Sequence, residues 1–150
     1  MESPHEPPPI IRELNYPRGV RPPLHRTLGI RIALSENGEG IAWIEIDKDV
    51  HWGATKVHGG VIPPLVDIAG AIAVAHTYPD AMKAIEGTVD MTVNYLKSAR
   101  EGDLTATGRA IHRGRRVGVA EVDVTSRGEL CAKALVTYIL RASSSDPEPA

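Results

Sequence analysis

The sequence predicts an α+β domain in which an antiparallel sheet wraps around one long central helix. Two short alternating strands precede a long apolar run rich in alanine, and four more strands follow from Thr88 onward. At 150 residues the chain is long enough for one domain with a sizeable core. Phenylalanine is absent, so Val, Ile, Leu and Ala must form most of that core.

The first two strands lie in "GIRIALSENGEGIAWIEID", residues 29–47. A turn of Glu, Asn and Gly at 36–40 separates two runs with period-two alternation, which is typical of a hairpin. In the second run, Ala42, Ile44 and Ile46 are expected to face the core.

The apolar run at 62–76 is longer than a strand, and its alanines favour a helix. Pro63 and Pro64 are tolerated in a first helical turn, because the N–H groups there have no helical partner, and Tyr78-Pro79 ends the pattern. Since this segment is apolar nearly all round, the helix is expected to be buried rather than to lie on a surface.

The remaining strands read "TVDMTVNYL", "DLTATGRAIH", "RVGVAEVDVT" and "LCAKALVTYIL", with Arg-Gly-Arg and Ser-Arg-Gly-Glu turns before the last two. In the first of them, alternation places Thr88 on one face and an apolar set on the other, namely Val89, Met91, Val93 and Tyr95. The ends of the chain differ in composition. Residues 1–22 form a proline-rich arm expected to lack regular elements, 23–141 the domain, and 142–150 a frayed tail.

Composition excludes several classes of function. The net charge is −2 and the pI near 6.3, so no broad nucleic-acid-binding face is expected. No segment approaches the roughly 18 uninterrupted apolar residues of a membrane span, and the acidic, proline-rich N-terminus is not a secretory signal. A lone cysteine, Cys131, excludes an internal disulfide and indicates a reducing compartment, the cytoplasm.

Asp67 is the one charged residue in the predicted helix. It is the fourth or fifth residue of a helix that starts at Pro64 or Pro63, too deep to act as an N-cap, and its neighbours leave no polar stripe. Burying an ionised carboxylate costs several kcal/mol unless it is paired, and the helix N-terminus offsets only about 0.3–1 kcal/mol of that. A catalytic role is therefore favoured over a structural one.

The tripeptide His58-Gly59-Gly60 directly precedes the helix, where backbone N–H groups can stabilise a developing oxyanion. A tight turn and an ordinary loop histidine are the alternative readings. No metal site is predicted, because the histidines and Asp67 lack the short spacing of a helical metal site. A serine-hydrolase elbow and a phosphate loop are absent from the sequence.

The stretch "VHGGVIPPLVDIAGAIA", residues 57–73, resembles the helix-start signature of the hotdog-fold acyl-CoA thioesterases, in particular the phenylacetate-degradation type. That signature is His-Gly-Gly, a short apolar spacer, then Leu-x-Asp entering a helix of small residues. The downstream strands and their Ala-Arg-x-Gly-Asp and Arg-Gly-Arg turns are similar as well, so the resemblance covers roughly residues 24–140. It implies a hotdog fold and dimers that often pair again into homotetramers.

The resemblance also implies roles for individual residues. Asp67 matches the catalytic carboxylate, a nucleophile or general base, and the Gly59 N–H matches the group that polarises the thioester carbonyl. His58 lines that site, and the Thr88 hydroxyl helps to hold the attacking water. In this family Asp67 faces the 58–60 loop of the other subunit, so Gly60 is expected to contact substrate. No cofactor is implied.

This chain departs from the family pattern before the loop. The family often has Asn six residues before the histidine and Gly three before it, where this chain has Trp52 and Thr55. Trp52 is therefore expected at a substrate-binding position where the Asn would contact the carbonyl or leaving group.

The turn "HRGRR", residues 112–116, presents Arg113, Arg115 and Arg116. They are either solvated turn residues or ligands of the coenzyme A phosphates, whose geometry suits guanidinium groups. Two alternatives to the hydrolase stay open, a hotdog dehydratase and a non-hydrolytic acyl-CoA-binding module. The acyl group also stays open among aryl-acetyl, short-chain and medium-chain thioesters.

Overall fold

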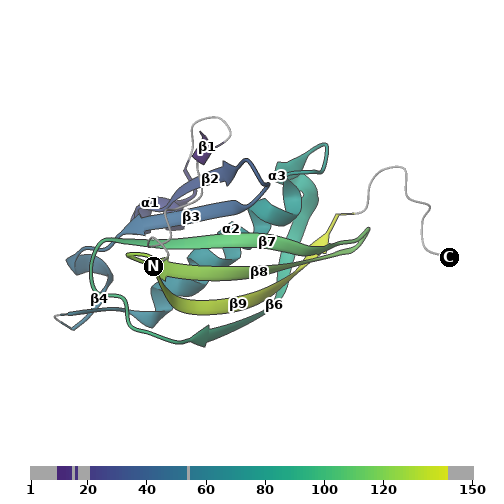
Figure 1. Cartoon of the computed structure of the whole chain (residues 1–150). Coiled ribbons are helices and arrows are strands. Elements are labelled where there is room, and N and C mark those ends of the chain that lie inside the picture. The colour runs from purple at the N-terminus through teal and green to yellow at the C-terminus, as the bar shows by residue number, and fades with distance from the viewer. Residues whose placement is uncertain (1–9, 15, 17–20, 54, 142–150) are drawn as a thin grey trace.

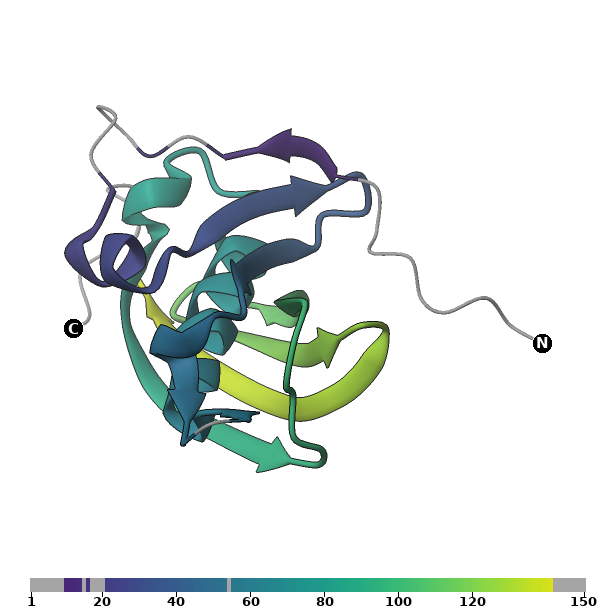
Figure 2. The same ribbon diagram turned by 90° about the vertical axis from the view of Figure 1, so that its left-hand side faces the viewer.

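The predicted hairpin and the four later strands belong to one curved sheet. This sheet wraps around the predicted central helix, α2 (Ile62–Ala75) (Figure 1). The structure, a computed structural model, describes residues 10–14, 16, 21–53 and 55–141. The sheet has seven antiparallel strands in the order β1-β2-β3-β7-β8-β9-β6, so β6 is an edge strand. The view turned by 90° shows the sheet curling around the helix (Figure 2). The predicted α+β hotdog class is confirmed.

The strands of this sheet, in chain order, are β1 (Ile10–Glu13), β2 (Arg31–Ser35), β3 (Gly40–Glu45), β6 (Ile85–Tyr95), β7 (Asp103–Arg113), β8 (Val117–Ser126) and β9 (Glu129–Leu140). A second, two-stranded sheet consists of β4 (His51–Trp52) and β5 (Lys56–Val57). The short helices are α1 (Pro23–Leu28), the 3-10 turns η2 (Lys48–Val50) and η3 (Gly59–Val61), and α3 (Ala81–Ala84).

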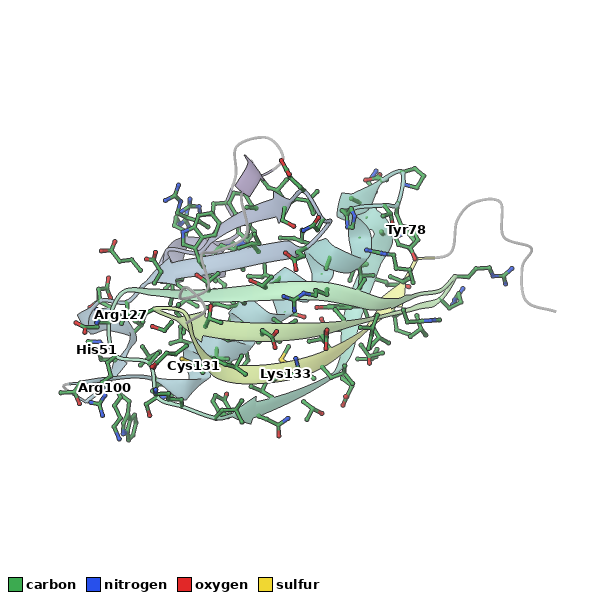
Figure 3. The ribbon with its side chains drawn as sticks, viewed as in Figure 1. His51, Tyr78, Arg100, Arg127, Cys131 and Lys133 are labelled. Carbon is green, nitrogen blue, oxygen red and sulfur yellow. The ribbon has the colours of Figure 1, made fainter. Side chains whose placement is uncertain are left out.

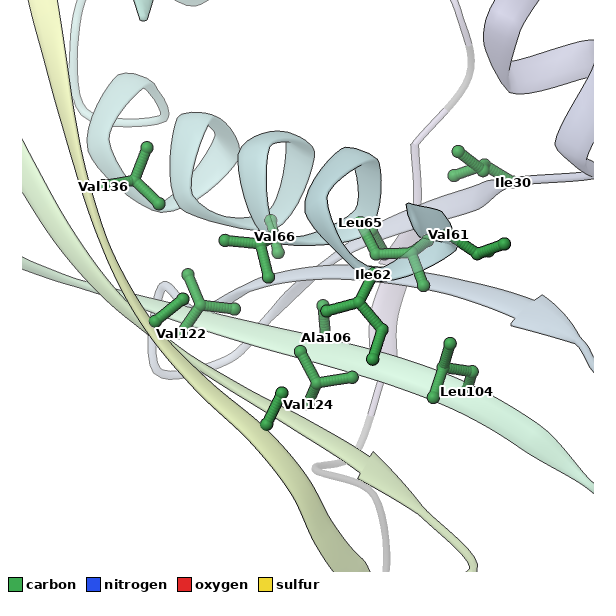
Figure 4. Packing of buried hydrophobic residues seen from close by; sticks show 14 of the residues in the cluster. Ile30, Val61, Ile62, Leu65, Val66, Leu104, Ala106, Val122, Val124 and Val136 are labelled. Atoms are coloured by element: carbon green, nitrogen blue, oxygen red, sulfur yellow. The ribbon is translucent and has the colours of Figure 1, made fainter. Parts of the chain in front are cut away.

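Helix α2 lies very close to the sheet at one point. Gly40 on β3 and Gly108 on β7 are partners in the strand register, and a Cβ atom on either would collide with the backbone of Ala69. Around this contact, Ile62, Leu65 and Val66 point from the helix toward the strands (Figure 4). The prediction that Val, Ile, Leu and Ala form most of the core is confirmed. Small side chains at the contact allow the helix backbone to approach the sheet.

The expectation that α2 is buried rather than at a surface is only half right. One face is fully buried, but the opposite face is half-buried within the subunit, because the sheet covers a single side of the helix. The half-buried stripe consists of Pro63, Pro64, Asp67, Ile68, Ala71 and Ile72. Asp67 therefore lies at a partly open surface and not inside the core.

Strand β6 does not follow the strict alternation that the sequence predicts. Its register with β9 shifts between Thr88, which is opposite Tyr138, and Asp90, which is opposite Thr137. This bulge adds one residue, Val89, which is 56% exposed and does not share the half-buried face of Met91 and Val93 that the alternation predicted for it. The extra residue turns the Thr88 side chain toward the helix.

The N-terminal segment also differs from the prediction. Ile10–Glu13 forms strand β1, which pairs with β2, so the expectation that residues 1–22 carry no regular element is wrong at these positions. The rest of the predicted arm at 1–9, 15 and 17–20 and the predicted tail at 142–150 lie outside the described residues. Within the described ranges, no helix has the length and apolar character needed to cross a membrane.

Candidate active site

The carboxylate of Asp67 is held by a hydroxyl from the edge strand. Asp67 is the sixth residue of α2 and half-buried, and the Thr88 hydroxyl donates to its Oδ1 at 2.7 Å. The bulge in β6 is what directs Thr88 to this position. Among the described residues Thr88 is the one hydrogen-bond donor to this carboxylate, so its second oxygen can accept a proton from water or a substrate.

The loop His58-Gly59-Gly60 is fixed from both sides of one peptide unit. The Gly60 N–H donates to His58 Nδ1 at 2.8 Å, and the Tyr95 hydroxyl donates to the Gly59 carbonyl at 3.0 Å. The N–H of Ile62 donates to the same carbonyl, which closes η3. Since Nδ1 accepts a hydrogen bond, a neutral His58 ring carries its proton on Nε2.

This arrangement distinguishes the two glycines. The Gly60 N–H is occupied by His58, whereas the Gly59 N–H has no acceptor among the residues that the structure describes. Gly59 is also the first residue of η3, which leads into α2, so its N–H lies at the positive end of the helix dipole. Gly59 is therefore the better placed of the two to polarise a carbonyl oxygen.

Trp52 covers the outer side of this loop. Its ring packs edge-on against the His58 ring, with centroids 5.4 Å apart, and is 69% exposed. The β4–β5 hairpin that carries Trp52 is docked by main-chain bonds, including the one from the His58 N–H to the Val50 carbonyl at 2.7 Å. His51 contacts the Arg100 carbonyl at the same end of the sheet (Figure 3). An apolar ring thus stands beside the candidate oxyanion donor.

Within one subunit the predicted residues form two separate groups. Asp67 and Thr88 make one, and the loop at 58–60 with Trp52 makes the other. Gly59 precedes Asp67 by eight residues, which at the rise of a helix is about 12 Å along the axis. That is beyond hydrogen-bond reach of about 3 Å, so the two groups do not act on one carbonyl in a single subunit.

The predicted phosphate-binding arginines lie elsewhere. The Arg113 guanidinium donates to the Ala73 carbonyl at 2.8 Å, which satisfies a carbonyl in the last turn of α2. Arg115 and Arg116 are exposed in the turn between β7 and β8. The structure thus gives Arg113 a role in the fold, and a phosphate role for Arg113, Arg115 and Arg116 stays a prediction.

Two tyrosines at the site were not singled out by the sequence. Tyr95 was expected only as one of the apolar set of its strand, and Tyr138 was not distinguished from the rest of its strand. The Tyr138 hydroxyl donates to the Asp67 carbonyl at 2.6 Å. The available signal was chemical, because a tyrosine at an inward position of a strand needs a partner for its hydroxyl.

Comparison with known proteins is consistent with this geometry. Residues 55–141, more than half of the chain, match the thioesterase superfamily. The chain belongs to the thioesterase superfamily. This confirms the predicted hotdog thioesterase family and its class, a thioester hydrolase, while leaving the phenylacetate type open.

Several individual proteins are similar to this chain in sequence or in fold. Over 107 residues, which is 71% of this chain and 85% of the relative, it is 34% identical to the 1,4-dihydroxy-2-naphthoyl-CoA hydrolase of Listeria monocytogenes. A thioesterase of Haemophilus influenzae superposes with a TM-score of 0.72 at 24% identity, covering 79% of this chain and 82% of the other.

A phenylacetic acid degradation-related protein of Ralstonia eutropha superposes with a TM-score of 0.69 at 23% identity, covering 81% of this chain and 92% of the other. At these identities the two superpositions show the fold alone. A protein of Halobacterium salinarum is 42% identical over 74 residues, which is about half of its length, 48%.

Proposed function

We propose that this thioesterase-superfamily protein hydrolyses an acyl-CoA to free coenzyme A and a carboxylic acid. The observation that carries the proposal is the Asp67 carboxylate, which is held at one oxygen by Thr88 and open at the other on the half-buried face of α2. A carboxylate in this state can accept a proton or attack a carbonyl carbon.

The chemistry needs few groups because a thioester is already electrophilic. The Gly59 N–H donates to the carbonyl oxygen and stabilises the charge that develops there. As a general base, Asp67 takes a proton from water while the water oxygen bonds to the carbonyl carbon, and the C–S bond then breaks to release the thiolate of coenzyme A. As a nucleophile, Asp67 forms an anhydride that water hydrolyses afterwards. The thiolate is a good enough leaving group to need no strong acid.

A complete site requires a second subunit. Strand β6 contacts both groups, Asp67 through Thr88 and the loop through Tyr95, at points seven residues or roughly 20 Å apart. If two β6 edges pair antiparallel about a two-fold axis, the Tyr95 end of one strand lies beside the Thr88 end of the other. Each Asp67 then faces the 58–60 loop of the other subunit. Pairing also covers an edge strand that would otherwise promote aggregation, and two such dimers could pair again into a tetramer.

The substrate is proposed as an aryl-, short- or medium-chain acyl-CoA. The relatives point in different directions, since one is a naphthoyl-CoA hydrolase and another is related to phenylacetic acid degradation. The exposed Trp52 ring beside the loop favours an acyl group or pantetheine arm with apolar surface. We place the reaction in the cytoplasm, because the single cysteine is a free, buried thiol typical of a reducing compartment.

The proposal is tested by hydrolysis of a panel of acyl-CoAs with free thiol as the readout. The panel holds phenylacetyl-, 1,4-dihydroxy-2-naphthoyl-, acetyl- and octanoyl-CoA. Asp67→Asn keeps an acceptor for Thr88 but no base, so we expect a folded protein with kcat lowered by about 10²–10⁴-fold.

The matched control is Asp103→Asn, because Asp103 is exposed and makes no ion pair among the described residues. It should hydrolyse like wild type. Wild-type turnover by Asp67→Asn would remove Asp67 from the chemistry. Binding of acyl-CoA by wild type without any turnover would show a binding module in place of an enzyme.

A further inference from the structure

The phenol of Tyr138 connects the sheet to the residue that carries the proposed catalytic carboxylate. Tyr138 on β9 is fully buried, and its hydroxyl donates to the main-chain carbonyl of Asp67 at 2.6 Å. Its partner in the strand register is Thr88, whose hydroxyl donates to the Asp67 side chain. Two neighbouring hydroxyls therefore hold one residue, one by its main chain and the other by its carboxylate.

Gly70 makes room for this contact. A Cβ atom at Gly70 would collide with the Tyr138 hydroxyl and lie 3.3 Å from the Ala120 Cβ. Glycine is unfavourable inside a helix, so its place in the middle of α2 calls for a packing reason, and the hydroxyl supplies one. The preceding residue, Ala69, is the point at which α2 meets Gly40 and Gly108. The helix is thus fixed to the sheet over residues 67–70.

The Tyr138 hydroxyl remains a donor at neutral pH. Burial raises the pKa of Tyr138 well above its ordinary value of 10.0, and the negative charge of Asp67 raises it further. The N–H of Ala71 beside the hydroxyl offsets only part of this rise in the pKa. The phenol is therefore protonated throughout the range in which a thioesterase works, and its bond to the Asp67 carbonyl does not depend on pH there.

We propose that Tyr138 is a positioning residue that, with Gly70, sets the height and rotation of α2 so that the Asp67 carboxylate meets the thioester. The inference rests on the proposed function of Asp67. A displacement of about 1 Å at a reacting group can lower the rate by about 100-fold, so loss of this contact should reduce turnover without changing substrate binding.

The first variant is Tyr138→Phe, which removes one oxygen atom and keeps the ring. We expect kcat for the best thioester of the panel to fall about tenfold, with KM within about twofold of wild type. Its matched control is Tyr78→Phe. The Tyr78 hydroxyl likewise donates to a carbonyl, that of Gly114 at 2.9 Å, but it lies beyond the C-terminal end of α2 (Figure 3). Tyr78→Phe should lower Tm by a similar amount and leave kcat unchanged.

The second variant separates positioning from packing. In Gly70→Ala/Tyr138→Phe, the new methyl group occupies the space that the hydroxyl has left, so Tm should return to or exceed that of wild type. The hydrogen bond to Asp67 remains absent, so kcat should stay about tenfold low. Recovery of kcat together with Tm would overturn the proposal, because the hydroxyl would then only fill space. Should Tyr138→Phe fail to fold, the double variant decides alone.

Asp67→Asn in the same assay keeps the two proposals apart. Inactive Asp67→Asn with fully active Tyr138→Phe would overturn the positioning role and leave the thioesterase intact. Active Asp67→Asn would overturn both. Inactive Asp67→Asn with a pure kcat defect in Tyr138→Phe and in the double variant is the result that we expect.

Discussion

Gly59 and Gly60 are adjacent, but only one of them needs to be glycine for reasons of space. A Cβ atom at Gly60 would lie 2.9 Å from His58 Nδ1, the atom that accepts the Gly60 N–H. A Cβ atom at Gly59 would meet Tyr95 at 3.4 Å, which is ordinary contact. The two residues therefore differ in what a side chain would disturb.

We expect Gly60→Ala to lower the free energy of unfolding by about 1–2 kcal/mol and to impair hydrolysis, because the added methyl displaces the His58 ring. Gly59→Ala should change stability by less than about 0.5 kcal/mol, since it retains its N–H and its methyl fits. Urea unfolding of both variants measures the difference. Equal losses of stability would show that the His58–Gly60 contact does not hold the loop.

At the scale of elements, the C-terminal end of α2 is capped from the β7–β8 turn. Arg113 donates to the Ala73 carbonyl, so its positive charge lies where the helix dipole is negative. Arg115 and Arg116 of the same turn are the other two candidates for the phosphates of coenzyme A.

Arg113→Ala should therefore lower the free energy of unfolding by about 1 kcal/mol and leave KM unchanged. Arg115→Ala/Arg116→Ala should raise KM for acyl-CoA with little change in kcat, because ground and transition states lose the same contact. An acyl-N-acetylcysteamine has no phosphates and serves as the control substrate. An unchanged KM for acyl-CoA would leave these two arginines as turn residues only.

The outer face of the sheet carries a chain of ion pairs across β7, β8 and β9. Asp123 accepts from Arg109 at 3.0 Å and from Lys133 at 2.7 Å, and Arg109 also donates to Glu39 at 2.8 Å. Burial alone would raise the pKa of Asp123, but the hydrogen bonds from Lys133 and Arg109 outweigh it and lower the pKa below the ordinary 3.8.

Because the folded pKa of Asp123 is below the unfolded one, its contribution to stability is present above about pH 4 and is lost as pH falls through the folded value. We expect Asp123→Asn to cost about 0.5–1 kcal/mol at pH 7, allowing for solvent screening. The difference from wild type should shrink as the pH falls through the folded pKa of Asp123, as measured in a series of urea unfolding curves. Asp103→Asn, at an exposed carboxylate without an ion pair among the described residues, is the control. A cost for Asp123→Asn that is constant with pH would rule out this charge effect.

At the scale of the whole molecule, the proposed site combines α2 of one subunit with the loop of another. Asp67→Asn removes the helix contribution, and Gly60→Val disrupts the loop through the same collision with His58. In a hybrid of the two inactive variants, one of the two sites carries both defects and the other carries neither.

An equal mixture, refolded together, should therefore recover roughly a quarter of wild-type activity, since half of the dimers are hybrids with one intact site. Hydrolysis by the mixture is compared with that of each variant refolded alone, and sedimentation velocity gives the oligomeric state, dimer or tetramer. If the site lay within one subunit, every site of the hybrid would carry a defect and no activity would return.

Much of this protein can be predicted from local sequence, because hairpins, helix limits and strand alternation depend on neighbouring residues. The turn at 36–39, the start of α2 at Ile62 and its end before Tyr78 follow from Gly, Pro and the apolar period. Asp67 stands out for the same reason, as a charge within an apolar helix. These features need no knowledge of the fold beyond their own segment.

Tertiary structure decided the rest, because it depends on pairs of residues far apart in the chain. Tyr138 meets Asp67 across 71 positions and Tyr95 meets Gly59 across 36, and neither spacing leaves a local pattern. The bulge that turns Thr88 toward Asp67 depends on the register between β6 and β9, and strict alternation predicts the opposite face. The open face of α2 exists because the sheet covers one side of it. The sequence determined which residue carries the charge, and the packing of helix on sheet determined what holds it in place.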